Sequence, residues 1–297
     1  LWGVTILTSV NKNRLKTNKS GSEIIDKVIK LTSLAKDYGL YTIFMAGDST
    51  RTQPEFLQEV IVKVQENCDE LCIADSFGAI SPFGYRYLVE QVNSWTELPI
   101  SVHCHNHTSL AVANALAAVL GGASVIQTCV NGMGELSGVL PLEEIAVALP
   151  IHLGISTGIK LEGLKSLSDL VANVTGVPTN IQKPAVGDYT FAIPETWVSE
   201  AFISKLKDSS LNENVTYPPE IVGNKAYLPI GHKCNEYTIR YHLGNKGWDA
   251  TASTIQEIVK AVRLKAAEAK GYYLMDEAEF FKMIQEQGYE LTLIKKK

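Results

Sequence analysis

Short, β-branched apolar runs alternate along the first half of the chain with longer amphipathic stretches. The runs have the length of strands, and apolar residues in the amphipathic stretches recur at the spacing of one helix face. This alternation predicts an α/β protein with a parallel sheet, either doubly wound or closed into a barrel. The expected strands are 4–8, 41–46, 71–74, 100–104 and 123–129, and the expected helices are 22–38, 54–64, 82–94, 109–120 and 142–149.

Polar residues collect directly after each expected strand, and their positions distinguish the two architectures. A barrel gathers the carboxyl ends of all its strands around one mouth, whereas an open sheet concentrates function at one switch point. Separate clusters after every strand therefore favour a TIM (β/α)8 barrel, of which the chain carries the five C-terminal βα units. The clusters are Thr8-Ser9, Gly47–Arg51, Asp75-Ser76, His103–His107 and Asn131–Glu135.

The alternating pattern ends after Pro150. Irregular, turn-rich sequence follows, and two further helices are expected at 252–270 and 276–287. We therefore predict a barrel portion over residues 1–155, a linker with a small subdomain over 156–216, and a mainly helical C-terminal subdomain over 217–297. The chain opens directly on a strand, so we expect the first three βα units of the barrel to be omitted from this sequence rather than supplied by a separate polypeptide.

Composition excludes several classes of partner. The 27 Lys and Arg residues are dispersed among 32 Asp and Glu, for a net charge of −5, so no basic face is expected to bind nucleic acid. Five cysteines without a regular spacing indicate a reduced, cytoplasmic protein. No apolar run is long enough to cross a membrane, so no membrane partner is expected.

The strongest candidates for chemistry are His103 and His105, at the end of an expected strand. Residues two apart on a strand point to the same side, so both imidazoles are expected at the barrel mouth, where they suit a first-row divalent metal. The alternative is a pair of histidines hydrogen-bonded to their neighbours without metal. His107 has the same parity but lies beyond the strand, and its orientation stays open.

A divalent ion usually takes oxygen ligands as well, and three acidic residues follow strands. They are Asp48, Asp75 and Glu135. Two of them have a structural alternative, because Asp48 can pair with Arg51 and Asp75 can cap a turn. The glycine-rich segment around Glu135 is expected to form a loop after the last strand, where barrels often bind phosphate or cofactor groups.

Several motifs occur together between residues 4 and 150: His103-Cys104-His105-Asn106, Leu110–Leu116, Asn131–Glu135, Pro141–Glu144, Asp48–Thr52 and Ala74–Pro82. Together they resemble the metal-dependent DRE-TIM barrel superfamily. This superfamily includes isopropylmalate, homocitrate and citramalate synthases, hydroxymethylglutaryl-CoA lyase and 4-hydroxy-2-oxovalerate aldolase. The segment Tyr217–Gly223 and the helices after it are similar to the region that follows the barrel in the synthases, which favours that branch.

The resemblance implies a Claisen-type condensation in which a metal polarises the carbonyl of a 2-oxo acid and a base removes a proton from acetyl-CoA or another acyl-CoA. It also implies a divalent metal (Zn, Mn, Mg or Co), acetyl-CoA as co-substrate, and a homodimer. It assigns metal binding to His103 and His105, and it places Ser76 where the synthases hold the substrate carboxylate. We further expect catalytic roles for Asp48, Arg51 and Glu135, and substrate binding by Ser76, Thr8 and Asn106.

The chain departs from the superfamily's pattern at several positions. An acidic residue usually precedes the aspartate at 48, where this chain has Gly47, and Val139 replaces a metal-ligating asparagine. Valine neither ligates a metal nor moves a proton, so two alternatives stay open: a lyase or aldolase that cleaves a hydroxy acid, and a catalytically weakened binding subunit. The other departures are Lys12 and Val198 for histidines, His107 for an aspartate and Leu136 for an arginine.

Overall fold

The computed structural model describes residues 1–11, 21–193, 199–200, 203, 215–226, 228–269 and 273–294. Lys12, Val198 and the terminal lysines 295–297 lie outside the described residues. The chain forms two compact units, each described by itself: residues 1–161 with 167–178, and residues 162–166 with 179–297. The three-part division expected from the sequence stays a prediction.

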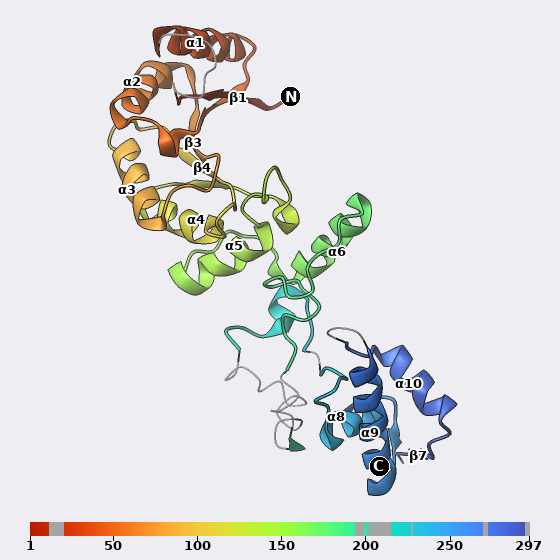
Figure 1. The fold of residues 1–297 in the computed structure, drawn as a ribbon. Coiled ribbons are helices and arrows are strands. Elements are labelled where there is room, and N and C mark those ends of the chain that lie inside the picture. The colour runs from red at the N-terminus through yellow and green to blue at the C-terminus, as the bar shows by residue number, and fades with distance from the viewer. Residues whose placement is uncertain are drawn as a thin grey trace. The chain divides into compact units, whose positions relative to one another are not determined.

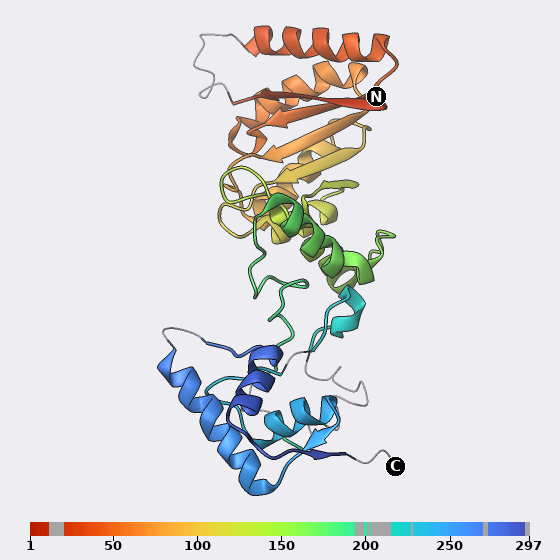
Figure 2. The same cartoon turned by 90° about the vertical axis from the view of Figure 1, so that its right-hand side faces the viewer.

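Five parallel strands form the sheet of the first unit, in the order β1-β2-β3-β4-β5 (Figure 1). Each strand pairs with the next one in the chain, and all run in the same direction (Figure 2). A doubly wound sheet would instead reverse its order at a switch point. The fold is therefore α/β, with five consecutive βα units of a TIM barrel, as predicted. The strands are β1 (Gly3–Ser9), β2 (Tyr41–Gly47), β3 (Glu70–Asp75), β4 (Ile100–Cys104) and β5 (Val125–Gln127).

A helix follows each strand, and the helices cover one face of the sheet (Figure 1). Phe44, Ile73 and Val102 point from the strands into this layer and are fully buried. The hydroxyl of the buried Tyr85 donates a hydrogen bond of 2.6 Å to the backbone oxygen of Ile73, which ties α3 to β3. All bounds lie within two residues of the predicted ones: α1 (Gly21–Asp37), α2 (Pro54–Val64), α3 (Pro82–Asn93), α4 (Ala111–Leu120) and α5 (Leu142–Ala148).

β5 is shorter than the predicted 123–129, because Cys129 forms its backbone hydrogen bonds with the later residues Leu140 and Leu142. The amide of Cys129 donates to the backbone oxygen of Leu140, and the oxygen of Cys129 accepts from the amide of Leu142, both at 3.0 Å. The intervening residues Asn131 to Val139 therefore close as a loop at the carboxyl end of the sheet.

The face of the sheet opposite the helices carries the residues that a closed barrel encloses. In the described part of the chain, Leu7 on this face is 63% exposed and Val125 is 38% exposed. The carboxyl ends of the strands are therefore accessible from this side.

The second unit is mainly helical, as predicted. Its helices are α8 (Glu236–Asn245), α9 (Ala252–Glu268) and α10 (Glu277–Glu286), and a two-stranded antiparallel sheet joins β6 (Trp248–Asp249) to β7 (Thr292–Leu293). Each helix begins at a polar cap whose side chain accepts from the backbone amide three residues later. These caps are Asn235, Thr251 and Asp276. None of the helices that the structure describes in either unit is long and apolar enough to span a bilayer.

Candidate active site at the carboxyl ends of the strands

His103 and His105 lie next to each other at the carboxyl end of β4. Their ring centroids are 5.1 Å apart, with an angle of 64° between the ring planes, as alternate residues on one strand face should be. The pair lines a cleft of about 300 Å³ where a barrel places its active site. The other lining residues are Leu7, Ser9, Met45, Gly47, Ala74, Ser76, Phe77, Glu135 and Leu136.

The His103 ring is held in its neutral form. Burial is the largest influence and lowers the pKa of His103, the hydrogen bond with Gln127 raises it, and the neighbouring His105 lowers it. The net effect is a pKa below the usual value for histidine. At neutral pH, one nitrogen of this ring therefore offers an electron pair, which metal ligation requires.

The histidine pair fits two positions of a metal shell. Nδ1 of His105 is buried without a hydrogen-bond partner among the described residues, and an unpaired buried nitrogen costs free energy unless something binds it. Within the same described part of the chain, no group of three His, Cys, Asp or Glu side chains could hold an ion. Asp48 and Asp75 bond to other groups and do not line the cleft, whereas Glu135 does line it, so completion of the shell by a carboxylate stays a prediction.

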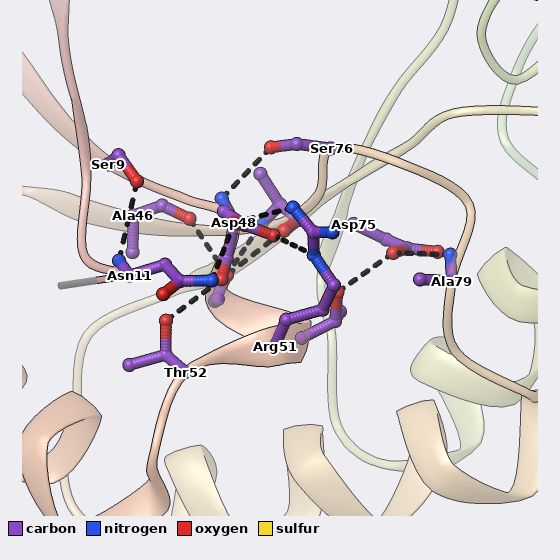
Figure 3. A network of polar contacts seen from close by, with 12 residues as sticks. Ser9, Asn11, Ala46, Asp48, Arg51, Thr52, Asp75, Ser76 and Ala79 are labelled. Atoms are coloured by element: carbon purple, nitrogen blue, oxygen red, sulfur yellow. Dashed lines mark hydrogen bonds and ion pairs between the residues drawn. The ribbon is translucent and has the colours of Figure 1, made fainter. Parts of the chain in front are cut away.

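Asp48 is fully buried directly after β2, and Arg51 occupies its carboxylate (Figure 3). The guanidinium donates from Nε to Oδ1 at 2.7 Å and from Nη2 to Oδ2 at 2.8 Å, and Asn11 donates to Oδ2 at 2.9 Å. Of the two roles considered for Asp48, the structure shows the pairing with Arg51. Neither of these two residues lines the cleft, so the structure does not bring them to the histidines as catalytic groups.

Asp48 also connects the ends of two strands through its backbone. It has a left-handed conformation, with φ of 60°, which aspartate tolerates better than most residues. This conformation directs its amide to the hydroxyl of Ser76 at 2.9 Å, and Ser76 lies in the cleft (Figure 3). Asp48 therefore links the ion pair with Arg51 to Ser76 in the cleft.

Asp75 was expected either to bind the metal or to cap a turn, and in the structure it caps a turn (Figure 3). Its Oδ1 accepts from the amide of Ala79 at 3.0 Å and from the hydroxyl of Thr50 at 2.8 Å. Its Oδ2 is buried and has no hydrogen-bond partner in the described residues. Asp75 does not line the cleft, because it alternates with Ala74 and Ser76 and these two face the cleft.

The loop after β5 brings Glu135 to the histidines. Val139 forms an antiparallel bridge with His105, and the amide of Asn106 donates to the oxygen of Gly138 at 2.9 Å. The loop thus lies along the end of β4 and is held by backbone bonds that need no particular side chain at Val139. Of the three catalytic residues expected from the sequence, only Glu135 lines the cleft.

Two of the expected substrate-binding residues lie off the cleft. Thr8 stands between Leu7 and Ser9, which both line it, so the alternation of a strand turns Thr8 to the other face. Asn106 uses its side-chain oxygen to accept from the amide of Ala111 at 3.2 Å, at the start of α4. Ser76 is the one expected substrate-binding residue in the cleft.

The sheet places further residues beside the histidines that were not predicted from the sequence. Gln127 is paired with His103 in the register of β4 and β5, and aligning the ends of the two predicted strands could have found it. Leu7 and Met45 could have been found from strand parity. Leu136 has a φ of 59° at the loop tip, and no sequence signal marks a leucine for that conformation.

The loop depends on Gly138, where we expect a substitution by alanine to lower the free energy of unfolding by about 1–3 kcal/mol. Gly138 has a φ of 82°, and an added Cβ would lie 2.0 Å from the oxygen of Gly132. Gly154 is a matched control, because its φ is 67° but no heavy atom lies within 4 Å of its Cβ position. Urea unfolding of Gly138→Ala and Gly154→Ala measures the difference. Equal stability of the two variants would show that the loop does not need this close approach.

The profile of the HMGL-like family matches residues 3–171. The chain belongs to this family. The match extends over more than half of the chain and includes all five βα units, the histidine pair and the loop after β5. The resemblance to the DRE-TIM barrels inferred from the motifs is thereby confirmed.

The curated relatives of the chain are synthases. A probable 2-isopropylmalate synthase of Methanosarcina mazei is 32% identical over 274 residues, which cover 92% of this chain and 52% of the relative. The (R)-citramalate synthase CimA of Methanocaldococcus jannaschii is 31% identical, with 95% and 56% covered. The homocitrate synthase AksA of Methanothermobacter thermautotrophicus is 32% identical, with 92% and 68% covered. The chain thus spans about half the length of the isopropylmalate synthases it matches.

Solved structures support the barrel fold. The hydroxymethylglutaryl-CoA lyase of Bacillus subtilis superposes with a TM-score of 0.54 at 23% identity, over 60% of this chain and 65% of the lyase. The corresponding lyase of Pseudomonas aeruginosa also gives a TM-score of 0.54, at 20% identity and over the same shares of the two chains. At these identities the likeness concerns the fold alone, and it agrees with the strand order observed here.

Proposed function

We propose that the full-length protein condenses acetyl-CoA, or another acyl-CoA, with a 2-oxo acid in a metal-dependent Claisen-type reaction. The observation that carries the proposal is the His103/His105 pair, which places two imidazoles at the mouth of a barrel of the HMGL-like family. The names of the curated synthases support the reaction class.

When bound, a divalent ion would polarise the carbonyl of the 2-oxo acid and stabilise the alkoxide that develops there. The proposed ligands from this chain are His103 and His105. Imidazole ligands favour Zn or Co over Mg and Mn, which prefer carboxylates and water.

The other cleft residues have proposed roles that follow from their chemistry. The Ser76 hydroxyl, which already accepts a hydrogen bond from the Asp48 amide, can donate its own hydrogen to a substrate carboxylate. Glu135 is the proposed proton-transfer group, as the carboxylate from the loop after β5 that lines the cleft. Asp48 and Arg51 are proposed to position Ser76 and not to touch substrate. Thr8 and Asn106 are not proposed to contact substrate.

Acetyl-CoA as co-substrate and a homodimer are further proposals, which rest on the synthase resemblance. A cytoplasmic location is also proposed, and it rests on the irregularly spaced cysteines. Gel filtration with light scattering of the full-length protein tests the dimer.

The test of the proposed function is release of free thiol from acetyl-CoA by the full-length protein. Pyruvate, 2-oxoisovalerate and 2-oxoglutarate form the substrate panel, because they differ in side-chain size and charge. We expect thiol release with at least one of them, a loss of at least about tenfold after chelation, and recovery on adding Zn²⁺, Mn²⁺ or Co²⁺.

Two outcomes would contradict the proposal. Cleavage of 4-hydroxy-2-oxo acids without any thiol release would select the lyase or aldolase alternative. A protein that retains no divalent ion and turns over no substrate would select the binding subunit.

A further inference from the structure

Gln127 contacts the ring of His103 from the neighbouring strand. The two residues are partners in the parallel register of β4 and β5, and Gln127 Oε1 lies 3.1 Å from His103 Nδ1. Pairing of the strands fixes the separation of the two backbones, so the contact is part of the sheet and does not depend on a loop. Among the described residues, Gln127 is the one side chain that hydrogen-bonds this ring.

With the oxygen of the Gln127 amide toward the ring, the contact determines which nitrogen of His103 carries hydrogen. An amide oxygen only accepts hydrogen bonds, so the Nδ1 atom facing it must donate. A neutral imidazole has a single N–H, and its other nitrogen, Nε2, then keeps the electron pair. His105 differs, because its Nδ1 has no partner in the described part of the chain.

We propose that Gln127 is a positioning residue that sets His103 in the Nδ1-protonated tautomer and so presents Nε2 to a divalent metal ion. Gln127 acts through His103 and does not itself line the cleft. Its effect on metal binding rests on the proposed function, whereas its effect on the tautomer does not. A neutral amide orients the ring without adding negative charge to the site, so the tautomer is set by hydrogen bonding alone.

Ring tautomers are read directly from ¹H–¹⁵N correlations of the histidine side chains in the metal-free, full-length protein. His103→Gln assigns the His103 signals by removing them. In the unsubstituted protein we expect His103 to carry its hydrogen on Nδ1. We expect Gln127→Leu to lose this preference and Gln127→Glu to keep it, because glutamate retains an acceptor at the same position.

Thr128→Val is the matched control, because Thr128 is the next residue in the chain and lines a different cavity with Ile126 and Ile145. It should leave the His103 signals unchanged. Circular dichroism of each variant checks that the fold is retained. If Gln127→Leu does not fold, the His103 ring signals of the unsubstituted protein and of Gln127→Glu still test the inference.

Calorimetric titration with Co²⁺ measures the consequence for the metal. We expect Gln127→Leu to weaken binding by about 10–100-fold, the usual effect of removing a partner of a ligating histidine. Thr128→Val should stay within about threefold of the unsubstituted protein, and Gln127→Glu should bind at least as tightly, because a carboxylate partner raises the basicity of a ligating histidine.

An Nε2-protonated His103 in the unsubstituted protein, or unchanged ring signals in Gln127→Leu, would overturn the inference. If the expected tautomers are found but the protein binds no Co²⁺, the tautomer-setting role stands, and the proposed function and the metal half of the inference are overturned.

Discussion

Replacing His103 and His105 together by alanine is expected to abolish binding of divalent metal and to slow the proposed condensation by at least about 1,000-fold. The reason is that Lewis-acid polarisation of the carbonyl supplies several kcal/mol of transition-state stabilisation, and each ~1.4 kcal/mol changes a rate tenfold. The described residues offer no replacement ligands, since no group of three metal-binding side chains exists among them. Metal content by mass spectrometry and thiol release by the full-length protein are the two measurements.

The control for this double substitution is His152→Ala, because His152 is an exposed histidine of the same unit. It should bind metal and turn over substrate as the unsubstituted protein does. The two cleft histidines are only partly buried, so their loss should leave the sheet folded. Full activity of the double variant, with its metal content unchanged, would show that the metal lies elsewhere in the full-length protein.

The sequence was sufficient to predict the features that depend on local periodicity. The strand and helix bounds followed from apolar spacing, because each element buries one face against its neighbours. The histidine pair followed from the two-residue repeat of a strand. The same rule, applied to β1, places Ser9 in the cleft and turns Thr8 to the other face.

Features made by contacts between distant residues could not be predicted in this way. The bridge between Val139 and His105 joins residues on two sides of α4, and the loop it closes decides that Glu135 reaches the cleft. The pairing of Asp48 with Arg51 was one of two possibilities in the sequence. The partly buried contacts of Asp48 with Asn11 and Ser76 come from neighbouring strand ends.

Replacing Asp48 by alanine is expected to lower the free energy of unfolding by about 3 kcal/mol, near the lower end of the ~3–5 kcal/mol for breaking a buried ion pair. The carboxylate is fully buried, whereas the side chain of Arg51 is 43% exposed and can turn to water, which limits the cost. Alanine also tolerates the φ of 60° at this position less well than aspartate does. The midpoint and slope of urea unfolding measure the change.

Two further variants show whether this loss comes from the buried pair. Glu59→Ala breaks the ion pair with Lys63, in which both side chains are about half exposed, and should cost no more than about 1 kcal/mol. Asp48→Asn keeps the left-handed backbone and one oxygen acceptor, so it should be less destabilised than Asp48→Ala. If Asp48 were a base acting on substrate, Asp48→Asn would unfold as the unsubstituted protein does and still lose nearly all turnover. The structure instead predicts that Asp48→Asn lowers the free energy of unfolding. Turnover should decrease only to the extent that the Ser76 hydroxyl loses its hydrogen bond from the amide of residue 48.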